Sequence, residues 1–519
     1  MRPELAELYA RLSFGLDANR PDAVDKRRRQ NRRTARANVE DLCDPGTFLE
    51  YGALAIAAQR SRRSMEDLIR KTPADGLIAG VAAVNGQWFA EERSRCMLMA
   101  YDYTVLAGTQ GHFNHKKMDR MLKLAYDQKL PLIYLGEGGG GRPGDVDASG
   151  VVVAGLDLGT FASFARLSGH VPVVGVVSGF CFAGNAALLG CCDVIIATSS
   201  SNIGMGGPVM IEGGGLGVYR PEEVGPMEVQ TENGVVDIEV ADDVQAMAVA
   251  RQCLSYFQGT LPVWEAGDQL RLRDLVPESR RRAYDVRTVI EGLADIGSFL
   301  ELRPKFGPSM VTGLLRIEGR PMGVIANNPA YMAGAIEAEG ADKAARLMML
   351  CNAHGLPILS LCDTPGFMVG PEVEKRAQVR HVCRMFVVGS HVSVPFFTVV
   401  LRRGYGLGVM AMAKGGFHES FFSAAWPTGE FGGMGLEGAV KAGFKKELAA
   451  VEDPQAREAL YNKLVAGMYE RGKAINAAAQ LEIDAVIDPA VTRQWLLQGL
   501  KSLPPRPPGA AQHAFVDPW

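Results

Sequence analysis

The chain has 519 residues, too many for one ordinary domain, and 47% of them are hydrophobic, as expected of a globular protein with an ample core. A net charge of −3 with 22% charged residues argues against a nucleic-acid or anionic-membrane partner and against disorder on the scale of a domain. The 60 glycines exceed the average share of roughly 7% and come in clusters.

The N-terminal region, residues 1–50, is predicted to be helical and charged, with a run of arginines between residues 27 and 36. It has early acidic residues and no apolar core of a secretory signal. No stretch holds 18 uninterrupted apolar residues, so we expect no membrane-spanning helix. Nine cysteines without CxxC spacing predict reduced thiols in a cytoplasmic protein and no metal site.

An internal repeat is the strongest organisational signal. Residues 115–135 and 341–361 each read as an amphipathic helix, a short turn and an apolar strand that ends in a glycine-rich loop. The segments align at an offset of 226 residues, and the pairs that match are Lys117 with Lys343, Pro131 with Pro357, and Gly140 with Gly366. Further along, Pro172 aligns with Pro395 at an offset of 223.

The repeat predicts two related α/β domains built from parallel βαβ units, whose strands are apolar on both faces because helices cover them. We expect the first domain at residues 1–258 and the second at residues 285–519. A linker is predicted around residues 259–300, which include two prolines and a charged stretch.

Four junctions between a strand and a helix carry the glycine clusters. Such a junction exposes free N–H groups at the start of the helix, which can bind an anion or an oxyanion that develops during a reaction. No Walker motif is present, and the first cluster lacks the acidic partner of a dinucleotide fingerprint. The junctions are residues 136–141, 178–186, 363–367 and 403–408.

Side chains suited to acid–base chemistry are few. No Ser/His/Asp or HExxH arrangement occurs, and the candidates in the second half are Asp363, His381, His391 and His418. Many N–H loops with few acids or bases fit a reaction whose base arrives with a cofactor.

The second half contains motifs that resemble the carboxyltransferase (beta) subunits of biotin-dependent acyl-CoA carboxylases, such as the propionyl-CoA and methylcrotonyl-CoA carboxylases. The resemblance is dense in the second half and looser across residues 40–255. The matching segments are Ala425-Trp426-Pro427-Thr428, residues 433–440, residues 319–329, and the run from residues 342–346 through residues 363–367.

This resemblance implies two tandem domains of the crotonase superfamily, each a ββα superhelix. In the family the active site lies between the N-domain of one subunit and the C-domain of another, and the subunits form hexamers built as trimers of dimers. A biotin carboxylase and a biotinylated carrier subunit complete the enzyme. The sequence Ala411-Met412-Ala413-Lys414 superficially resembles a biotinyl-lysine motif, but it falls in a predicted helix and is interpreted as structural.

The resemblance also implies a mechanism in which carboxybiotin loses CO2, the biotin anion removes the α-proton of an acyl-CoA, and the thioester enolate captures CO2. The acyl-CoA belongs to the first domain and biotin to the second. The family's first oxyanion hole maps to the N–H groups of Gly184 and Asn185, and the second to Leu407 and Gly408.

Further site residues follow from the same alignment with the family. The substrate-binding positions are Gly139, Gly140, Gly141, Ala183, Gly366, Phe367 and Met410, and the biotin-binding positions are Tyr405 and Gly406.

The chain departs from the family at both holes, where Gly-Gly and Gly-Ala are usual. An N–H survives any non-proline change, while the added side chains are expected to narrow the pocket. Val409 or Met410 stands where short-chain carboxylases often have a polar residue, which argues against acetyl- or propionyl-CoA as substrate.

Several alternatives stay open from the sequence. The chain is a carboxylase subunit, a subunit of a biotin-dependent decarboxylase, another crotonase-type enzyme acting on a CoA thioester, or a non-catalytic scaffold paralogue. The arginine run is either a solvated helix face or a source of contacts to CoA phosphates.

Overall fold

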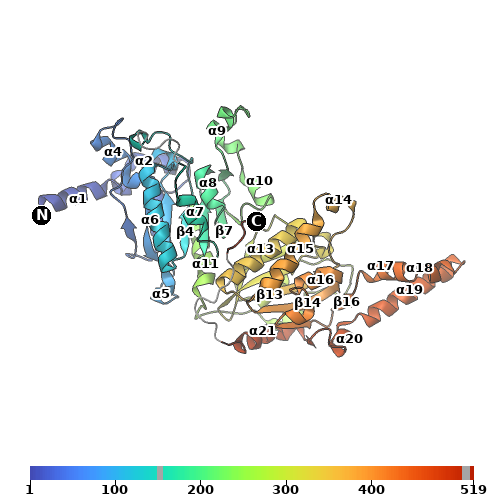
Figure 1. Ribbon diagram of the computed structural model, residues 1–519. Coiled ribbons are helices and arrows are strands. Elements are labelled where there is room, and N and C mark those ends of the chain that lie inside the picture. Colours follow the sequence, from blue (N-terminus) through green and yellow to red (C-terminus); the bar gives the residue numbers. More distant parts are fainter. Residues whose placement is uncertain (149–155, 505–514) are drawn as a thin grey trace. The chain divides into compact units, whose positions relative to one another are not determined.

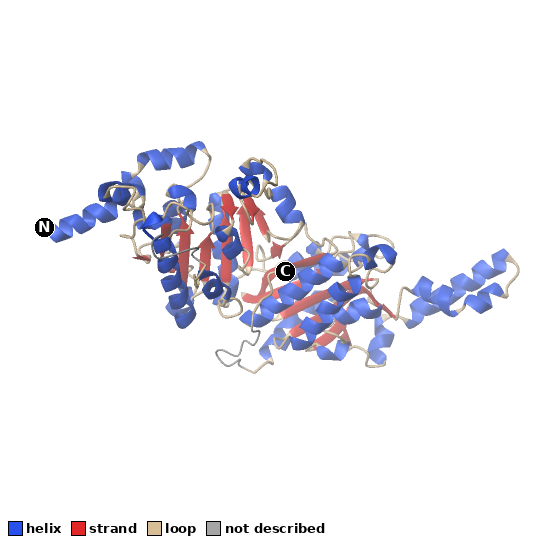
Figure 2. Cartoon of the chain, turned by 45° about the horizontal axis from the view of Figure 1, so that its top comes forward, coloured by secondary structure: helices blue, strands red, loops and turns tan. Residues whose placement is uncertain are grey.

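The computed structural model describes residues 1–148, 156–504 and 515–519, and it divides into two compact units. The first comprises Met1–Gly259 with residues 515–518, and the second begins at Thr260 and includes Trp519. The predicted linker segment after residue 259 therefore lies with the second unit. Figure 2 shows helices flanking the strands in each unit.

A seven-stranded sheet, ordered β1-β2-β3-β4-β5-β7-β9, forms the centre of the first unit. The first two pairings are antiparallel and the rest are parallel, as the apolar runs of the sequence predicted. A second, two-stranded parallel sheet joins β6 to β8. The strands are β1 (Leu49–Tyr51), β2 (Leu77–Ala83), β3 (Arg95–Tyr101), β4 (Leu132–Leu135), β5 (Val173–Val177), β6 (Phe180–Phe182), β7 (Val194–Thr198), β8 (Asn202–Gly204) and β9 (Ile238–Val240).

Helices cover this sheet, and α6 runs alongside it in Figure 1. Two caps show why helices start where they do: Thr34 accepts from the Ala37 N–H, and Asp242 accepts from the Gln245 N–H. The helices are α1 (Pro3–Ser13), α2 (Pro21–Arg29), α3 (Ala35–Leu42), α4 (Met65–Lys71), α5 (Glu91–Ser94), α6 (His112–Gln128), α7 (Thr160–Ala165), α8 (Gly184–Leu189), α9 (Pro208–Gly213), α10 (Met227–Glu232) and α11 (Asp243–Gln258).

The second unit repeats the plan with the order β10-β11-β12-β13-β14-β15-β17, and β16 adds to β14. Again the first two pairings are antiparallel and the others parallel. The strands are β10 (Leu300–Leu302), β11 (Met310–Ile317), β12 (Arg320–Asn327), β13 (Ile358–Thr364), β14 (Phe396–Tyr405), β15 (Phe422–Ala425), β16 (Glu430–Gly432) and β17 (Ala485–Val486).

Helices α13 and α15 pack together over this sheet, whereas α17, α18 and α19 form an arm that extends from it (Figure 1). None of the residues of α19 is buried within the described chain. The helices are α12 (Arg287–Leu293), α13 (Ala338–His354), α14 (Pro371–Glu374), α15 (Gln378–His391), α16 (Gly406–Met412), α17 (Leu436–Gly443), α18 (Lys445–Ala449), α19 (Pro454–Arg471), α20 (Ala474–Ala479) and α21 (Thr492–Lys501).

The structure confirms the internal repeat in detail. Helices α6 and α13 have the same length and begin 226 residues apart, as do the residues in left-handed backbone before them, Ala107 and Ala333, both with φ of 55°. The bridges Gln110–Gly141 and Ile336–Phe367 also correspond, since 336 − 110 and 367 − 141 both equal 226. The fold is therefore a duplicated α/β architecture.

Lys117 and Lys343, which the repeat aligned, are both buried. The Lys343 ammonium donates to the Met310 carbonyl at 2.7 Å, and the Lys117 ammonium donates to the Gly52 carbonyl at 3.2 Å. Burial lowers the pKa of Lys117 to about 8 and that of Lys343 to about 7. These lysines tie helix to sheet in each unit.

Among the described residues, no helix is both long and apolar enough to cross a bilayer.

Candidate functional site

The bend between β6 and α8 holds the first predicted pair of N–H groups. Ala183 has φ of 51°, a strained value for a residue with a Cβ, and its own N–H donates to the Gly204 carbonyl at 3.0 Å. Gly184 and Asn185 open α8, so their N–H groups have no acceptor within the helix. Nor does any other described residue accept from them.

The Asn185 side chain turns inward and does not occupy the space in front of these N–H groups. It is fully buried, its Oδ1 accepts from the Gly140 N–H at 2.9 Å, and its Nδ2 donates to the Gly108 carbonyl at 3.4 Å. The expected narrowing of the pocket therefore does not come from this residue. Asn185 instead joins α8 to two glycine-containing loops.

The glycine loop after β4 contributes shape more than N–H donors. The N–H groups of Gly138, Gly139 and Gly140 donate to Phe180, Ala107 and Asn185 respectively. A Cβ at Gly140, where φ is +85°, would lie 2.6 Å from the Ala183 Cβ and 3.4 Å from the Gly184 nitrogen. Glycine at position 140 thus leaves room beside the open N–H pair.

Gly141 differs from its neighbours, because no described residue accepts from its N–H and its missing Cβ faces open space. Gly139 and Gly141 are the exposed members of the loop.

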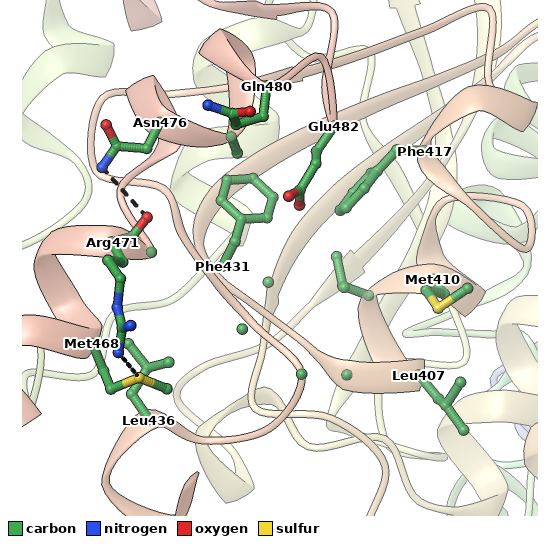
Figure 3. Close-up of a pocket in the computed structure, with 17 residues that line it drawn as sticks. Leu407, Met410, Phe417, Phe431, Leu436, Met468, Arg471, Asn476, Gln480 and Glu482 are labelled. Atoms are coloured by element: carbon green, nitrogen blue, oxygen red, sulfur yellow. Dashed lines mark hydrogen bonds between the residues drawn. The ribbon is translucent and has the colours of Figure 1, made fainter. Parts of the chain in front are cut away.

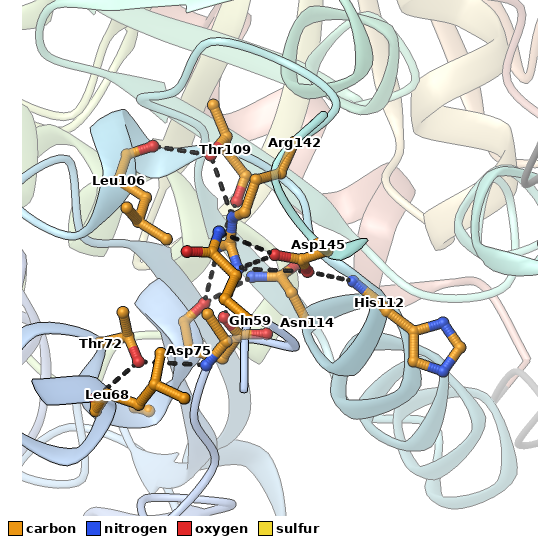
Figure 4. Close-up of polar contacts among 12 residues, drawn as sticks. Gln59, Leu68, Thr72, Asp75, Leu106, Thr109, His112, Asn114, Arg142 and Asp145 are labelled. Atoms are coloured by element: carbon orange, nitrogen blue, oxygen red, sulfur yellow. Dashed lines mark hydrogen bonds and ion pairs between the residues drawn. The ribbon is translucent and has the colours of Figure 1, made fainter. Parts of the chain in front are cut away.

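A buried ionic network fixes the end of this loop, and the sequence gave no warning of it. Figure 4 shows the Arg142 guanidinium between Asp75, Asp145 and Thr109. Its Nη2 donates to the Thr109 carbonyl at 2.7 Å, and Asp145 accepts from the His112 N–H at 2.9 Å, so the loop is tied to the start of α6. Burial raises the pKa of Asp75, and the Arg142 charge opposes that rise.

A second buried pair joins the loop to the N-terminal helices. Glu137 accepts from Arg27 through both of its carboxylate oxygens, at 2.8 and 2.7 Å, and from Arg32 at 3.2 Å. Burial raises the pKa of Glu137, and these two arginines counteract the rise. Part of the arginine run is therefore structural.

The remaining arginines of the run divide into two kinds. Arg33 pairs with Asp41 and Arg36 with Glu50, while Arg28 is 76% exposed and lies 3.9 Å from Asp25. Arg29 is also exposed. Any contact of this run with a phosphate would fall to the exposed members.

The bend between β14 and α16 in the second unit repeats the geometry of the first. Gly406 has φ of +59°, close to the 51° of Ala183, and Leu407 and Gly408 follow it at the start of α16. No described residue accepts from the N–H groups of Leu407 and Gly408. Leu407 is 59% exposed, so its side chain points away from the core.

Gly408 packs directly against the loop after β13. A Cβ at this position would lie 2.6 Å from the Gly366 Cα and 3.2 Å from the Phe367 nitrogen. The Gly366 N–H is bonded to the Thr364 hydroxyl at 3.1 Å, and its carbonyl accepts from the Ile336 N–H at 3.0 Å. The structure thus brings Gly366, Phe367, Leu407 and Gly408 together.

Tyr405 precedes the bend and points into the unit. Its hydroxyl donates to Glu430 at 3.1 Å, and burial together with the Glu430 charge raises its pKa. Tyr405 therefore anchors the strand that leads to α16.

A cavity of about 730 Å³ opens beside this second bend (Figure 3). Leu407 and Met410 lie at one side of it, and the aromatic rings of Phe417 and Phe431 form part of the wall. Its other lining residues are Gly404, Gly406, Val409, Gly432, Gly433, Leu436, Met468, Arg471, Gly472, Asn476, Ala477, Gln480 and Glu482.

The acid–base candidates of the second half are held in structural contacts. Asp363 is fully buried and accepts from Arg402 at 2.9 Å and from Arg403 at 2.7 Å. The His381 ring lies 2.7 Å from Asp342, and His391 contacts the Val387 carbonyl at 2.8 Å. The Ala411–Lys414 sequence has its first three residues buried at the end of α16, as its structural interpretation predicted.

No group of three or more His, Cys, Asp or Glu side chains within the described ranges is arranged to hold a metal ion. What the two bends offer is a pair of open main-chain N–H groups each, which suits stabilisation of negative oxygen atoms.

Comparison with known proteins gives consistent matches over most of the chain. Residues 26–506 match the model of the carboxyl transferase domain. The methylmalonyl-CoA carboxyltransferase 12S subunit of Propionibacterium freudenreichii is 30% identical, over 92% of this chain and 90% of that protein. The biotin-dependent long chain acyl-coenzyme A carboxylase beta4 subunit of Mycobacterium tuberculosis is 30% identical, over 96% and 94%.

Solved structures agree with these matches. A single-chain, multi-domain long-chain acyl-CoA carboxylase superposes with a TM-score of 0.91 at 56% identity; the alignment covers 96% of this chain and 49% of that one, so this chain spans about half of it. The hexameric transcarboxylase 12S, with methylmalonyl-CoA bound, superposes with a TM-score of 0.82 at 28% identity, over 99% and 97%.

Proposed function

The chain belongs to the carboxyl transferase family, and from that premise we propose that it moves a carboxyl group from carboxybiotin to the α-carbon of an acyl-CoA. The observation that carries this proposal is the pair of unoccupied N–H groups at the same bend of both units, Gly184 with Asn185 and Leu407 with Gly408. Each pair can hold one of the two oxyanions that the reaction creates.

The N–H groups of Gly184 and Asn185 stabilise the thioester oxygen as the α-carbon loses its proton. The strained Ala183 and the missing Cβ of Gly140 keep these donors accessible. Because the donors are fixed before the reaction begins, they need no reorganisation when negative charge moves onto the oxygen.

The N–H groups of Leu407 and Gly408 bind the ureido oxygen of biotin, with Tyr405 and Gly406 setting the bend. Their fit to biotin rests on the open donors and on the cavity beside them. Carboxybiotin, brought by a separate carrier, is a substrate here and supplies both the CO2 and the base. This accounts for an acid–base inventory in which Asp363 and His381 are held in ion pairs.

We propose a long-chain acyl-CoA as the substrate and a hexamer as the assembly. The single-chain relative that is 56% identical is a long-chain acyl-CoA carboxylase, and Met410 supplies an apolar side chain beside the second pair of donors. The hexamer follows the assembly of the 12S relative. The biotin carboxylase and carrier modules reside on partner chains.

The test is carboxyl transfer from radiolabelled bicarbonate in the presence of ATP, a biotin carboxylase and a biotinylated carrier, over a panel of acyl-CoAs. Label should appear in the acyl-CoA only when all components are present. A hexamer that gives no transfer to any acyl-CoA would identify a non-catalytic scaffold and refute the proposal.

A further inference from the structure

The cavity beside α16 is large for the ring of biotin alone and has a graded lining. We propose that it receives the acyl chain of the CoA thioester and thereby makes the enzyme selective for long chains. This inference rests on the proposed carboxyl transfer. Its volume of about 730 Å³ lies within the range of about 300–1,000 Å³ typical of small-molecule sites.

Apolar side chains from four separate elements line the cavity. Leu407 and Met410 come from α16, Phe431 from β16, Leu436 from α17 and Met468 from α19. Two of these, Met410 and Met468, are unbranched and adapt to chains of different shape. An apolar wall of this extent fits methylene groups, which gain about fourfold in affinity for each one buried.

Polar side chains gather at the other end of the cavity. In Figure 3, Arg471, Asn476 and Gln480 lie across the cavity from Leu407 and Met410. Arg471, Asn476, Gln480 and Glu482 are all exposed, so this end meets solvent. A chain that outgrows the apolar part can therefore emerge without burying a charge.

The chemistry of the reaction fixes where the chain must begin. The α-carbon takes the carboxyl group from biotin, so the next carbon of the chain starts beside the bound biotin ring. Leu407 supplies both a predicted donor to that ring and a wall of the cavity. The apolar end of the cavity is thus the end at which the chain enters.

Gly433 offers a direct way to fill the cavity. It lines the cavity, its backbone does not require glycine, and a Cβ there would meet no atom within 4 Å. Gly443 is a matched control, because it too has open space at its missing Cβ but does not line the cavity.

The experiment compares Gly433→Leu with Gly443→Leu in the full chain, using acetyl-, octanoyl- and palmitoyl-CoA with the biotin carboxylase and carrier. We expect Gly433→Leu to lower the ratio of kcat/KM for palmitoyl-CoA to that for acetyl-CoA by at least about tenfold, the loss of two buried methylenes. Gly443→Leu should leave the ratio unchanged. Gly433→Ala and Gly433→Val give the graded series if the leucine variant unfolds.

Three results would overturn the inference. An equal loss for all chain lengths, or a raised KM for the carrier, would assign the cavity to the biotin arm. An unchanged ratio would leave the cavity without a role in selectivity. If the wild type transfers no carboxyl group at all, the proposed function fails, and calorimetric binding of palmitoyl-CoA to the two variants still decides whether the cavity holds the chain.

Discussion

Replacing Leu407 by proline removes one donor of the second pair while leaving the helix able to form. Leu407 is the second residue of α16, so its N–H makes no intrahelical bond, and proline is well tolerated in a first turn. Its side chain is 59% exposed, so little packing is lost. Loss of one oxyanion-hole donor costs about 2.7–4 kcal/mol, and we expect kcat to fall roughly 100- to 1,000-fold.

Leu407→Ala is the control, because it removes the same side chain but keeps the N–H. Both variants should show the hexamer and thermal unfolding of the wild type, and carboxyl transfer should be measured at saturating carrier and acyl-CoA. If Leu407→Pro folds normally and stays within about threefold of Leu407→Ala, the N–H of Leu407 contributes no oxyanion stabilisation on the scale of one donor.

Three further predictions concern the parts that hold the two bends. Gly408→Ala places a methyl group 2.6 Å from the Gly366 Cα, so we expect a loss of about 1–3 kcal/mol in the free energy of unfolding and reduced transfer, both absent in Gly443→Ala. Glu137→Gln leaves the buried Arg27 charge without its carboxylate and should destabilise the first unit by about 3–5 kcal/mol in denaturant titration. Lys343 has a pKa of about 7 when folded against a usual value of 10.5, so the unfolded chain binds more protons between these limits and stability rises with pH there. The stability of the wild type relative to Lys343→Met should therefore increase by about 2 kcal/mol from pH 7 to pH 9, and a constant difference would contradict the low pKa.

The duplicated fold was predictable because its signals are local. The helix, turn and apolar strand around Pro131 recur around Pro357, and each signal lies within about twenty residues of sequence. The loops that carry Gly184 and Gly408 were found for the same reason, since glycine-rich bends after apolar strands are visible in the sequence itself.

Contacts between distant residues were not predictable in this way. Arg142 meets Asp75 across 67 positions, and Glu137 meets Arg27 across 110. Nothing in the composition of either loop indicates the partner. The inward turn of the Asn185 side chain is another example, because only the folded loops supply the Gly108 carbonyl and the Gly140 N–H that it binds.

The two bends show how a duplicated fold keeps a main-chain function while its side chains diverge. Positions 184 and 407 correspond, since both follow a residue with φ near 55°, yet they tolerate different residues. A Cβ at Gly184 would lie 2.1 Å from the Gln110 Oε1, whereas the Leu407 side chain stands largely free. The next positions reverse this pattern: the Asn185 side chain is a buried clamp, and Gly408 has no room for a Cβ. Departures from glycine at these sites therefore follow the space behind each bend, and they give no reason to infer a loss of the N–H donors.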